Sequence, residues 1–189
     1  MDVTVETLER SARIPSESIR GLSSEDLSRP TPCADWDVRA LLSHLVMGNV
    51  MSAARLSHGE LPDPNSDFLG DDPSAAYEAS VRDMVTAFRR EGVLDETFQH
   101  RFLGNRTGQE LLRIRVMDSI AHGWDLAAAL DHPRDREPEL YQQVLEYARP
   151  MVASLGSSGN EHFAAPQEAP DGASPADQYA ALLGRRVPT

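Results

Sequence analysis

Apolar residues recur three and four positions apart over most of this chain, and this spacing predicts a helical protein. Residues on one face of an α-helix repeat with that period, whereas a half-buried strand alternates every second residue. Five long stretches carry the helical spacing: 3–22, 36–58, 74–91, 107–130 and 137–154. Helices with one apolar stripe must bury that stripe against one another. We therefore predict an all-α bundle.

Several helix ends carry recognisable signals. Asp35 can accept a hydrogen bond from the free amides of a helix that begins at Trp36. Thr107 stands three residues before Glu110, the spacing of a capping box, which supports a helix start there. Pro15 lies inside the first stretch, where the loss of an internal hydrogen bond predicts a kink or a break.

The remaining segments are predicted to connect the helices. Their compositions are rich in proline, glycine and small polar residues, and they cover 28–35, 59–73, 93–106 and 155–176. Residues 93–106 alternate partly and are interpreted as an extended connector rather than a strand. The last segment is expected to wrap over the bundle as a long loop that ends in a short extra helix, 177–186.

Length and charge limit the classes of function. A chain of 189 residues that is 40% hydrophobic suits one domain, 1–189, with residues 155–189 appended to the bundle. Its 18 basic residues are all arginine and face 30 acidic ones, so the net charge of −12 predicts that it binds neither nucleic acid nor a membrane surface. The absence of lysine excludes Schiff-base chemistry and the lysine of a phosphate-binding loop.

The cellular location is predicted from the single cysteine and from the residues at the N-terminus. Cys33 is the single cysteine, so no disulfide can form within the chain. The first residues show no basic-then-apolar signal pattern, and no run of about 18 apolar residues could span a bilayer. We expect a cytoplasmic protein.

Three polar residues stand on the apolar faces of two predicted helices. His44 follows Leu41 by three positions, which places its imidazole on the buried side of the 36–58 helix. Asp118 and His122 are four residues apart, so they project from one face of the 107–130 helix. Two histidines and a carboxylate form a set of metal ligands that leaves coordination positions open for water or substrate.

Each of these residues also has a purely structural interpretation. His44 can be a core histidine that bonds to a neighbouring helix, and Asp118 with His122 can be a carboxylate–imidazole pair that satisfies itself. The sequence does not show that the two helices face each other. The metal site and the ordinary buried polar group therefore both remain open on this argument.

Other residues near these motifs have weaker signals. Cys33 is interpreted as a small buried thiol at the start of the 36–58 helix rather than as a nucleophile. Asp125 is a candidate to orient a ligand histidine or to pair with an arginine. For Arg113 and Arg115, a solvated side chain is favoured over a substrate-carboxylate contact. Buried packing is favoured over a stacking role for the indoles of Trp36 and Trp124.

Three strings of the sequence resemble one known family. They are TPCADWDVRALLSHL at 31–45, HGWDLAAAL at 122–130 and ASPADQYAALLGRR at 173–186. Together they look like the signature regions of the mycothiol-dependent maleylpyruvate isomerase family, in its actinobacterial metal-binding branch among the DinB-like bundles. This resemblance implies an up-down-down-up four-helix bundle that binds a divalent metal ion, with zinc preferred and nickel as the alternative.

The resemblance also implies which residues hold the metal. The family's histidine and its acid-x-x-x-His pair match His44, Asp118 and His122. The characterised isomerase has glutamate at the acid position, so the shorter Asp118 bears on the choice of metal.

Two classes of function follow. The first is an enzyme in which the metal activates a small thiol such as mycothiol for transfer to, or isomerisation of, a small electrophile. The second is a non-catalytic metal-binding sensor or interaction protein, since a fold does not determine its chemistry. The oligomeric state is left open, with a homodimer as one expectation because such bundles often pair through apolar helix faces.

Overall fold

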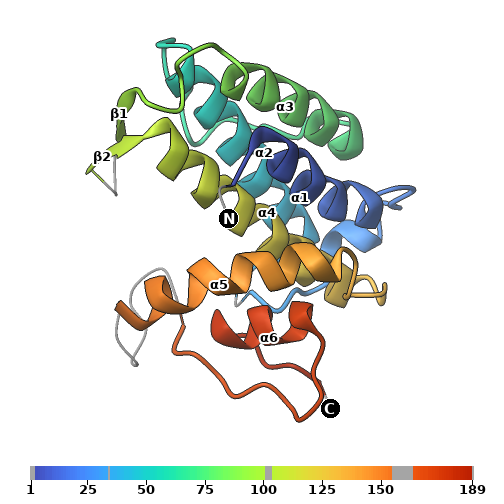
Figure 1. Cartoon of the computed structure of the whole chain (residues 1–189). Coiled ribbons are helices and arrows are strands. Elements are labelled where there is room, and N and C mark those ends of the chain that lie inside the picture. The colour runs from blue at the N-terminus through green and yellow to red at the C-terminus, as the bar shows by residue number, and fades with distance from the viewer. Residues whose placement is uncertain (1–2, 34, 101–103, 155–163, 189) are drawn as a thin grey trace.

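The computed structural model describes residues 3–33, 35–100, 104–154 and 164–188. Six α-helices and a small hairpin make up the fold: α1 (Val5–Ser18), α2 (Val38–Leu56), α3 (Pro73–Phe88), β1 (Thr97–His100), β2 (Gly104–Thr107), α4 (Gly108–Ala129), α5 (Pro138–Ser154) and α6 (Pro175–Leu182), with a short 3-10 turn η1 (Asp26–Ser28) before α2 (Figure 1). The predicted helical bundle is confirmed, and the structure adds the small hairpin to the all-α expectation.

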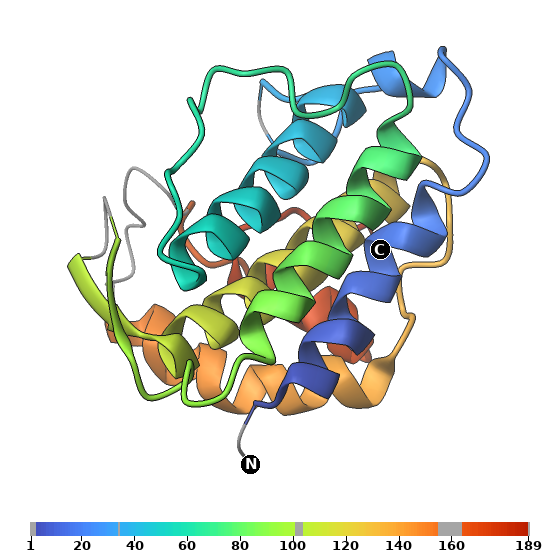
Figure 2. The same ribbon diagram turned by 90° about the horizontal axis from the view of Figure 1, so that it is seen from above.

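The first four helices form the bundle. In Figure 2, α2 and α3 run in one direction and α1 and α4 run in the opposite direction. The long connection between α2 and α3 makes this possible, because it returns the chain to the end of the bundle from which α2 began. This is the up-down-down-up order that the family resemblance implies. The most extensive contacts join α1 to α4 and α2 to α3, and α2 also contacts α4, so α4 is a neighbour of both α1 and α2.

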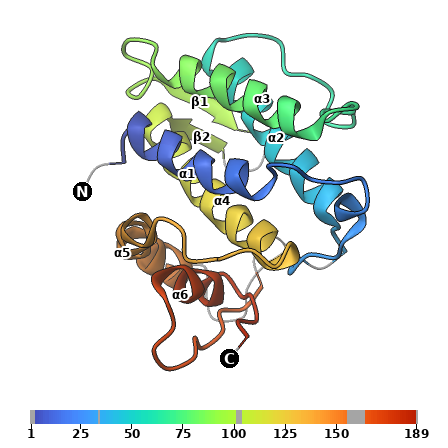
Figure 3. The ribbon, with the colours of Figure 1, turned by 90° about the vertical axis from the view of Figure 1, so that its right-hand side faces the viewer.

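The last two helices cover one side of the bundle. Figure 3 shows α5 end-on beneath α4, with α6 packed below it. The indole Nε1 of Trp124 in α4 donates to Asp177 of α6 at 2.8 Å, and the hydroxyl of Tyr179 in α6 donates to the carbonyl of Met117 at 3.0 Å. The short extra helix is thereby bonded directly to the helix that carries Asp118 and His122. The predicted wrapping loop falls partly on 155–163, outside the described residues.

The predicted start of α4 is confirmed, whereas that of α2 is not. Thr107 caps α4, and Glu110 completes the reciprocal bonds of the capping box, as predicted. The predicted start of α2 at Trp36 is wrong: Asp37 is the cap, accepting from Ala40, and the helix begins at Val38. The reason is that the backbone of Trp36 is engaged in the preceding loop, where its carbonyl accepts from the amide of Thr31.

Two further expectations are corrected. The predicted break at Pro15 is wrong: α1 continues through this residue, which lacks only its own amide bond, and ends one turn later at Ser18, with the Pro15 carbonyl accepting from the amide of Ile19. Residues within 93–106 form a two-stranded antiparallel hairpin rather than an extended connector, with Phe98 paired to Arg106 and its ring buried. No helix in the described part of the chain is long and apolar enough to cross a membrane.

Candidate metal centre

The loop before α2 is folded back on itself and brings the side chains of Cys33 and Trp36 to the bundle. The amide of Val38 donates to the carbonyl of Arg29, and the amide of Trp36 donates to the carbonyl of Cys33. Asp35 adopts a positive φ of 67°, which turns the chain between the two sides of this loop. The turn brings the half-buried indole of Trp36 to 4.9 Å, centroid to centroid, from the imidazole of His44.

His44, Asp118 and His122 converge at one point between α2 and α4. The Nε2 atom of His44 lies 3.3 Å from Oδ1 of Asp118, and the Nε2 atom of His122 lies 3.6 Å from the same oxygen. One ligand-type atom from each residue lies within 4.8 Å of the others. The structure thus brings together the three residues that the sequence singled out, from two helices more than 70 positions apart.

The three side chains are covered to different degrees. The His44 side chain is 30% exposed and that of Asp118 is 22% exposed, whereas that of His122 is 12% exposed. The group is therefore least covered on the His44 side. A surface hollow that Arg55 and His58 line, at the far end of α2, includes none of the three side chains.

Asp118 is held as a carboxylate by its neighbours. Burial alone would raise its pKa, but the charge of Arg115 and the adjacent imidazoles hold the pKa of Asp118 well below its usual range. The Nη1 group of Arg115 donates to Oδ2 at 3.0 Å, which leaves Oδ1 facing the two histidines. Arg115 is only 7% exposed, so the expectation that it is solvated is wrong, whereas Arg113 is exposed.

His122 is oriented from behind by Asp125. The Nδ1 atom of His122 lies 2.9 Å from Oδ2 of Asp125, whose side chain is fully buried. Burial raises the pKa of Asp125, but the hydrogen bond from His122 and the charge of Arg185 outweigh it and lower the pKa to about 2. An ionised carboxylate only accepts, so Nδ1 of His122 donates to Asp125, and Nε2 is the ring nitrogen left to face Asp118.

Arg185 secures Asp125 from the segment that follows α6. Its Nε donates to Oδ1 at 3.2 Å and its Nη2 donates to Oδ2 at 2.9 Å, a two-pronged contact with both oxygens. Both roles of Asp125 were expected from the sequence, whereas no role was expected for Arg185. The one feature of the sequence that pointed to Arg185 was its place in the arginine pair at the end of the 173–186 string.

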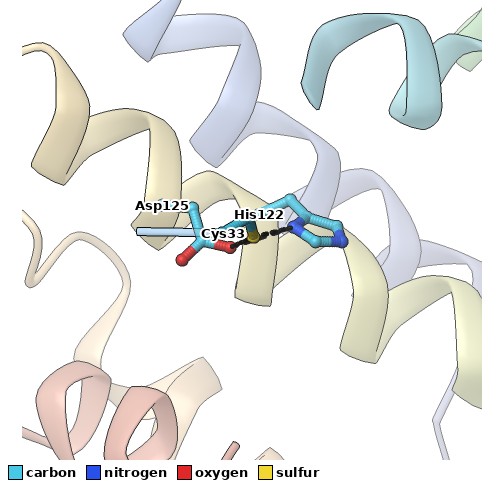
Figure 4. Close-up of side chains that lie close together, drawn as sticks. All are labelled: Cys33, His122 and Asp125. Atoms are coloured by element: carbon cyan, nitrogen blue, oxygen red, sulfur yellow. Dashed lines mark hydrogen bonds and ion pairs between the residues drawn. The ribbon is translucent and has the colours of Figure 1, made fainter. Parts of the chain in front are cut away.

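Cys33 belongs to the same cluster, which the sequence did not show. Its Sγ atom lies 3.1 Å from Oδ2 of Asp125 and 3.8 Å from Nδ1 of His122, and Figure 4 shows the three side chains meeting on one side of the imidazole. Burial and the charge of Asp125 raise the pKa of the thiol to about 12, so at neutral pH it donates to Asp125 as a thiol. Cys33 lies in the loop before α2, not at the helix start.

Cys33, His122 and Asp125 could also hold a cation, but their environment argues against it. Asp125 already pairs with Arg185, whose Nη2 lies 3.5 Å from the sulfur of Cys33. A second cation there would have to displace a guanidinium. In the set of His44, Asp118 and His122, the arginine Arg115 bonds Oδ2 of Asp118, so Oδ1 and the two Nε2 atoms face one another, and this donor chemistry fits a divalent ion.

The two tryptophans of the motifs differ in environment. Trp124 is buried in the core, as predicted. Trp36 is half-buried, and its ring lies 4.9 Å from that of His44 and 6.0 Å from that of His122, so it forms one wall of the site.

Comparison with known proteins relates this arrangement to one family. Residues 9–127 match the family described as the mycothiol maleylpyruvate isomerase N-terminal domain. An uncharacterized protein of Mycobacterium tuberculosis, found in each of two strains, is 32% identical over 169 residues, which is 89% of this chain and 90% of that protein.

Solved structures share the fold. The crystal structure of the mycothiol-dependent maleylpyruvate isomerase superposes with a TM-score of 0.62 at 17% identity, covering 84% of this chain and 72% of that one. A mutant of the same enzyme gives the same values. At this identity the likeness establishes the architecture and leaves the activity open.

Proposed function

Because the chain belongs to the mycothiol maleylpyruvate isomerase N-terminal domain family, we propose that it is a metal-dependent enzyme that transfers a small thiol to an electrophile or uses the thiol to isomerise one. The ligands are His44, Asp118 and His122, the metal is zinc with nickel as the alternative, and the thiol is mycothiol or a close analogue. The observation that carries the proposal is the convergence of the two Nε2 atoms and Oδ1 within 4.8 Å.

A divalent ion at this position would supply the positive charge that lowers the pKa of a bound thiol toward neutrality. The chain's own residues prepare that step. Asp125 accepts from Nδ1 of His122 and so leaves Nε2 as the nitrogen available to a metal, and Arg115 keeps Asp118 ionised and turned toward the histidines. Both ligands are thus oriented for coordination by the chain itself.

The surroundings support a small-molecule thiol rather than the protein's own cysteine as the nucleophile. The Cys33 thiol is protonated and donates to Asp125, away from Nε2 of His122. His44 and Trp36 are both only partly buried, and we expect an external thiol to approach along this side. The reaction we propose breaks the S–H bond of that thiol, whose proton passes to solvent water, and forms a carbon–sulfur bond between the resulting thiolate and an electrophilic carbon. In a transfer a leaving group departs with the electron pair, and in an isomerisation the thiol itself is released again.

The test begins with the metal content of the protein purified without added metal and after treatment with a chelator. Zinc-loaded and chelated protein are then assayed with mycothiol and two electrophiles, chlorodinitrobenzene for transfer and maleylpyruvate for isomerisation. We expect the zinc-loaded protein to turn over at least one electrophile. This turnover should be lost in the chelated protein and in His44→Ala. If the protein retains metal but accelerates neither the transfer nor the isomerisation, the result would support the non-catalytic metal-binding alternative.

A further inference from the structure

We propose that Arg115 is a positioning residue that aims one oxygen of Asp118 at the metal, and that Gly48 serves to make room for its guanidinium. The inference rests on the proposed metal site, and it concerns how the site is built. Arg115 stands one turn before Asp118 on α4 and donates from Nη1 to Oδ2 at 3.0 Å, so the carboxylate presents Oδ1 alone to His44 and His122.

The guanidinium is held in place by a chain of contacts that crosses three helices. Its Nη2 donates to Oδ1 of Asn49 on α2 at 2.7 Å. Asn49 in turn donates from Nδ2 to the hydroxyl of Ser80 on α3 at 3.0 Å, and Ser80 donates to the carbonyl of Tyr77 at 2.7 Å. Asn49 and Ser80 are both buried. The direction of the Asp118 carboxylate is therefore set from a distance by α2 and α3.

Gly48 provides the space in which the guanidinium lies. A Cβ atom at this position would meet Nη1 of Arg115 at 2.4 Å, Cζ at 3.0 Å and Nη2 at 3.2 Å. The 2.4 Å between this Cβ atom and Nη1 is shorter than real Cβ contacts, so any residue but glycine would push the guanidinium aside. Glycine in the interior of a helix destabilises it relative to alanine. Its presence in the middle of α2 is explained by the close approach of Arg115.

The arrangement has a further cost that a purely structural arginine would avoid. The Nε atom of Arg115 is buried with no hydrogen-bond partner among the described residues. Buried unpaired donors are rare in folded proteins and usually have a local reason. Both Nη groups are instead directed at Asp118 and Asn49, which is the geometry that orients the carboxylate.

The experiment is a titration of metal-free protein with Co²⁺ alone, followed by visible absorption, whose intensity and band positions report the coordination geometry. The variants are Arg115→Met, Arg115→Lys and Gly48→Ala. Arg82→Met is the control, because Arg82 is exposed on α3 and its replacement removes the same charge. Circular dichroism establishes that each variant is folded.

We expect Arg115→Met and Gly48→Ala to weaken Co²⁺ binding about 10- to 100-fold, the usual effect of losing a residue that orients a ligand, and to change the spectrum. Arg115→Lys should restore part of the affinity, and Arg82→Met should match the wild type. Wild-type affinity and spectrum in folded Arg115→Met would overturn the inference. If that variant does not fold, Gly48→Ala decides, because it keeps the charge, and wild-type binding there would overturn the inference. Failure of the wild type to bind Co²⁺ would count against the proposed metal site.

Discussion

His122 donates its Nδ1 proton to a fully buried carboxylate, Asp125, and thereby presents Nε2 to Asp118. The two residues are three positions apart on α4, so the same helix that supplies a ligand also supplies the group that orients it. Arg185 and Cys33 both donate to Asp125 from other parts of the chain. The orientation of one imidazole thus depends on the loop before α2 and on the segment after α6.

Replacing His122 tests the metal site most directly. We expect His122→Ala to lose at least nine-tenths of the bound metal, because the remaining imidazole and carboxylate cannot hold an ion tightly. Metal content after purification and dialysis is the measurement. His58→Ala is the matched control, since His58 is an exposed histidine just beyond the C-terminal end of α2, where it bonds Glu96. Equal metal content in both variants would show that the ion binds elsewhere.

The contribution of the C-terminal segment can be tested at Arg185. We expect Arg185→Met to lower the free energy of unfolding by about 3–5 kcal/mol, because it leaves the buried carboxylate of Asp125 without its cation. It should also weaken zinc binding roughly 10-fold through His122. Denaturant unfolding and zinc titration measure the two effects. Arg186→Met, an exposed neighbour, is expected to change neither quantity, and a similar loss in both variants would contradict the role of Arg185.

Cys33 is expected to be dispensable for metal binding. Cys33→Ala should retain the wild-type zinc content, because the sulfur lies against Arg185 and Asp125 rather than beside Nε2 of His122. The protonated thiol should also react slowly with iodoacetamide near pH 8, since its pKa is about 12. Loss of zinc in Cys33→Ala would instead favour the set of Cys33, His122 and Asp125 as the site.

Asp125 predicts a specific dependence of stability on pH in the metal-free protein. Its pKa falls from an ordinary value of 3.8 to about 2 on folding, so the unfolded state binds the proton more readily. The stabilisation is fully present above about pH 5 and is lost as pH falls through 4 toward 2. We expect the difference in unfolding free energy between wild type and Asp125→Asn to narrow by about 2 kcal/mol over that window. A difference that stays constant with pH would contradict the lowered pKa.

Gly123, inside the HGWD string, is expected to be required for helix packing. A Cβ atom there would meet Cγ2 of Ile14 at 2.7 Å and Cδ of Pro15 at 3.2 Å, so α1 could not approach α4 as closely. Gly123→Ala should lower the free energy of unfolding by about 1–3 kcal/mol despite the better helix propensity of alanine. At Gly59 a Cβ atom would make only an ordinary contact at 3.5 Å, so Gly59→Ala is the control in the same denaturation experiment.

Much of the fold could be predicted because its signals are local. The apolar spacing located the helices, and the capping box at Thr107 and Glu110 located the start of α4 within one residue. The start of α2 was misplaced because Asp35 and Asp37 are both suitable caps. The choice between them depends on the bonds between Thr31 and Trp36 in the preceding loop.

The candidate site also has one part that local geometry predicts and another that helix packing decides. That Asp118 and His122 share a face follows from helix geometry alone, since residues four apart lie one turn above each other. The solvated state expected for Arg115 was wrong, because its burial against Asn49 depends on how closely α2 approaches α4 at Gly48. Nothing in the spacing of α4 indicates that approach.

The sequence by itself therefore determined which residues form helices, where one of those helices begins, and which ligand-type side chains share a helical face. All of these depend on interactions within a few residues. The tertiary structure alone decided that His44 meets Asp118 across 74 positions. It also decided that Cys33 and Arg185, 152 positions apart, meet at Asp125. Such contacts depend on how helices pack and on the paths of the loops between them, which the periodicity of a single helix does not encode.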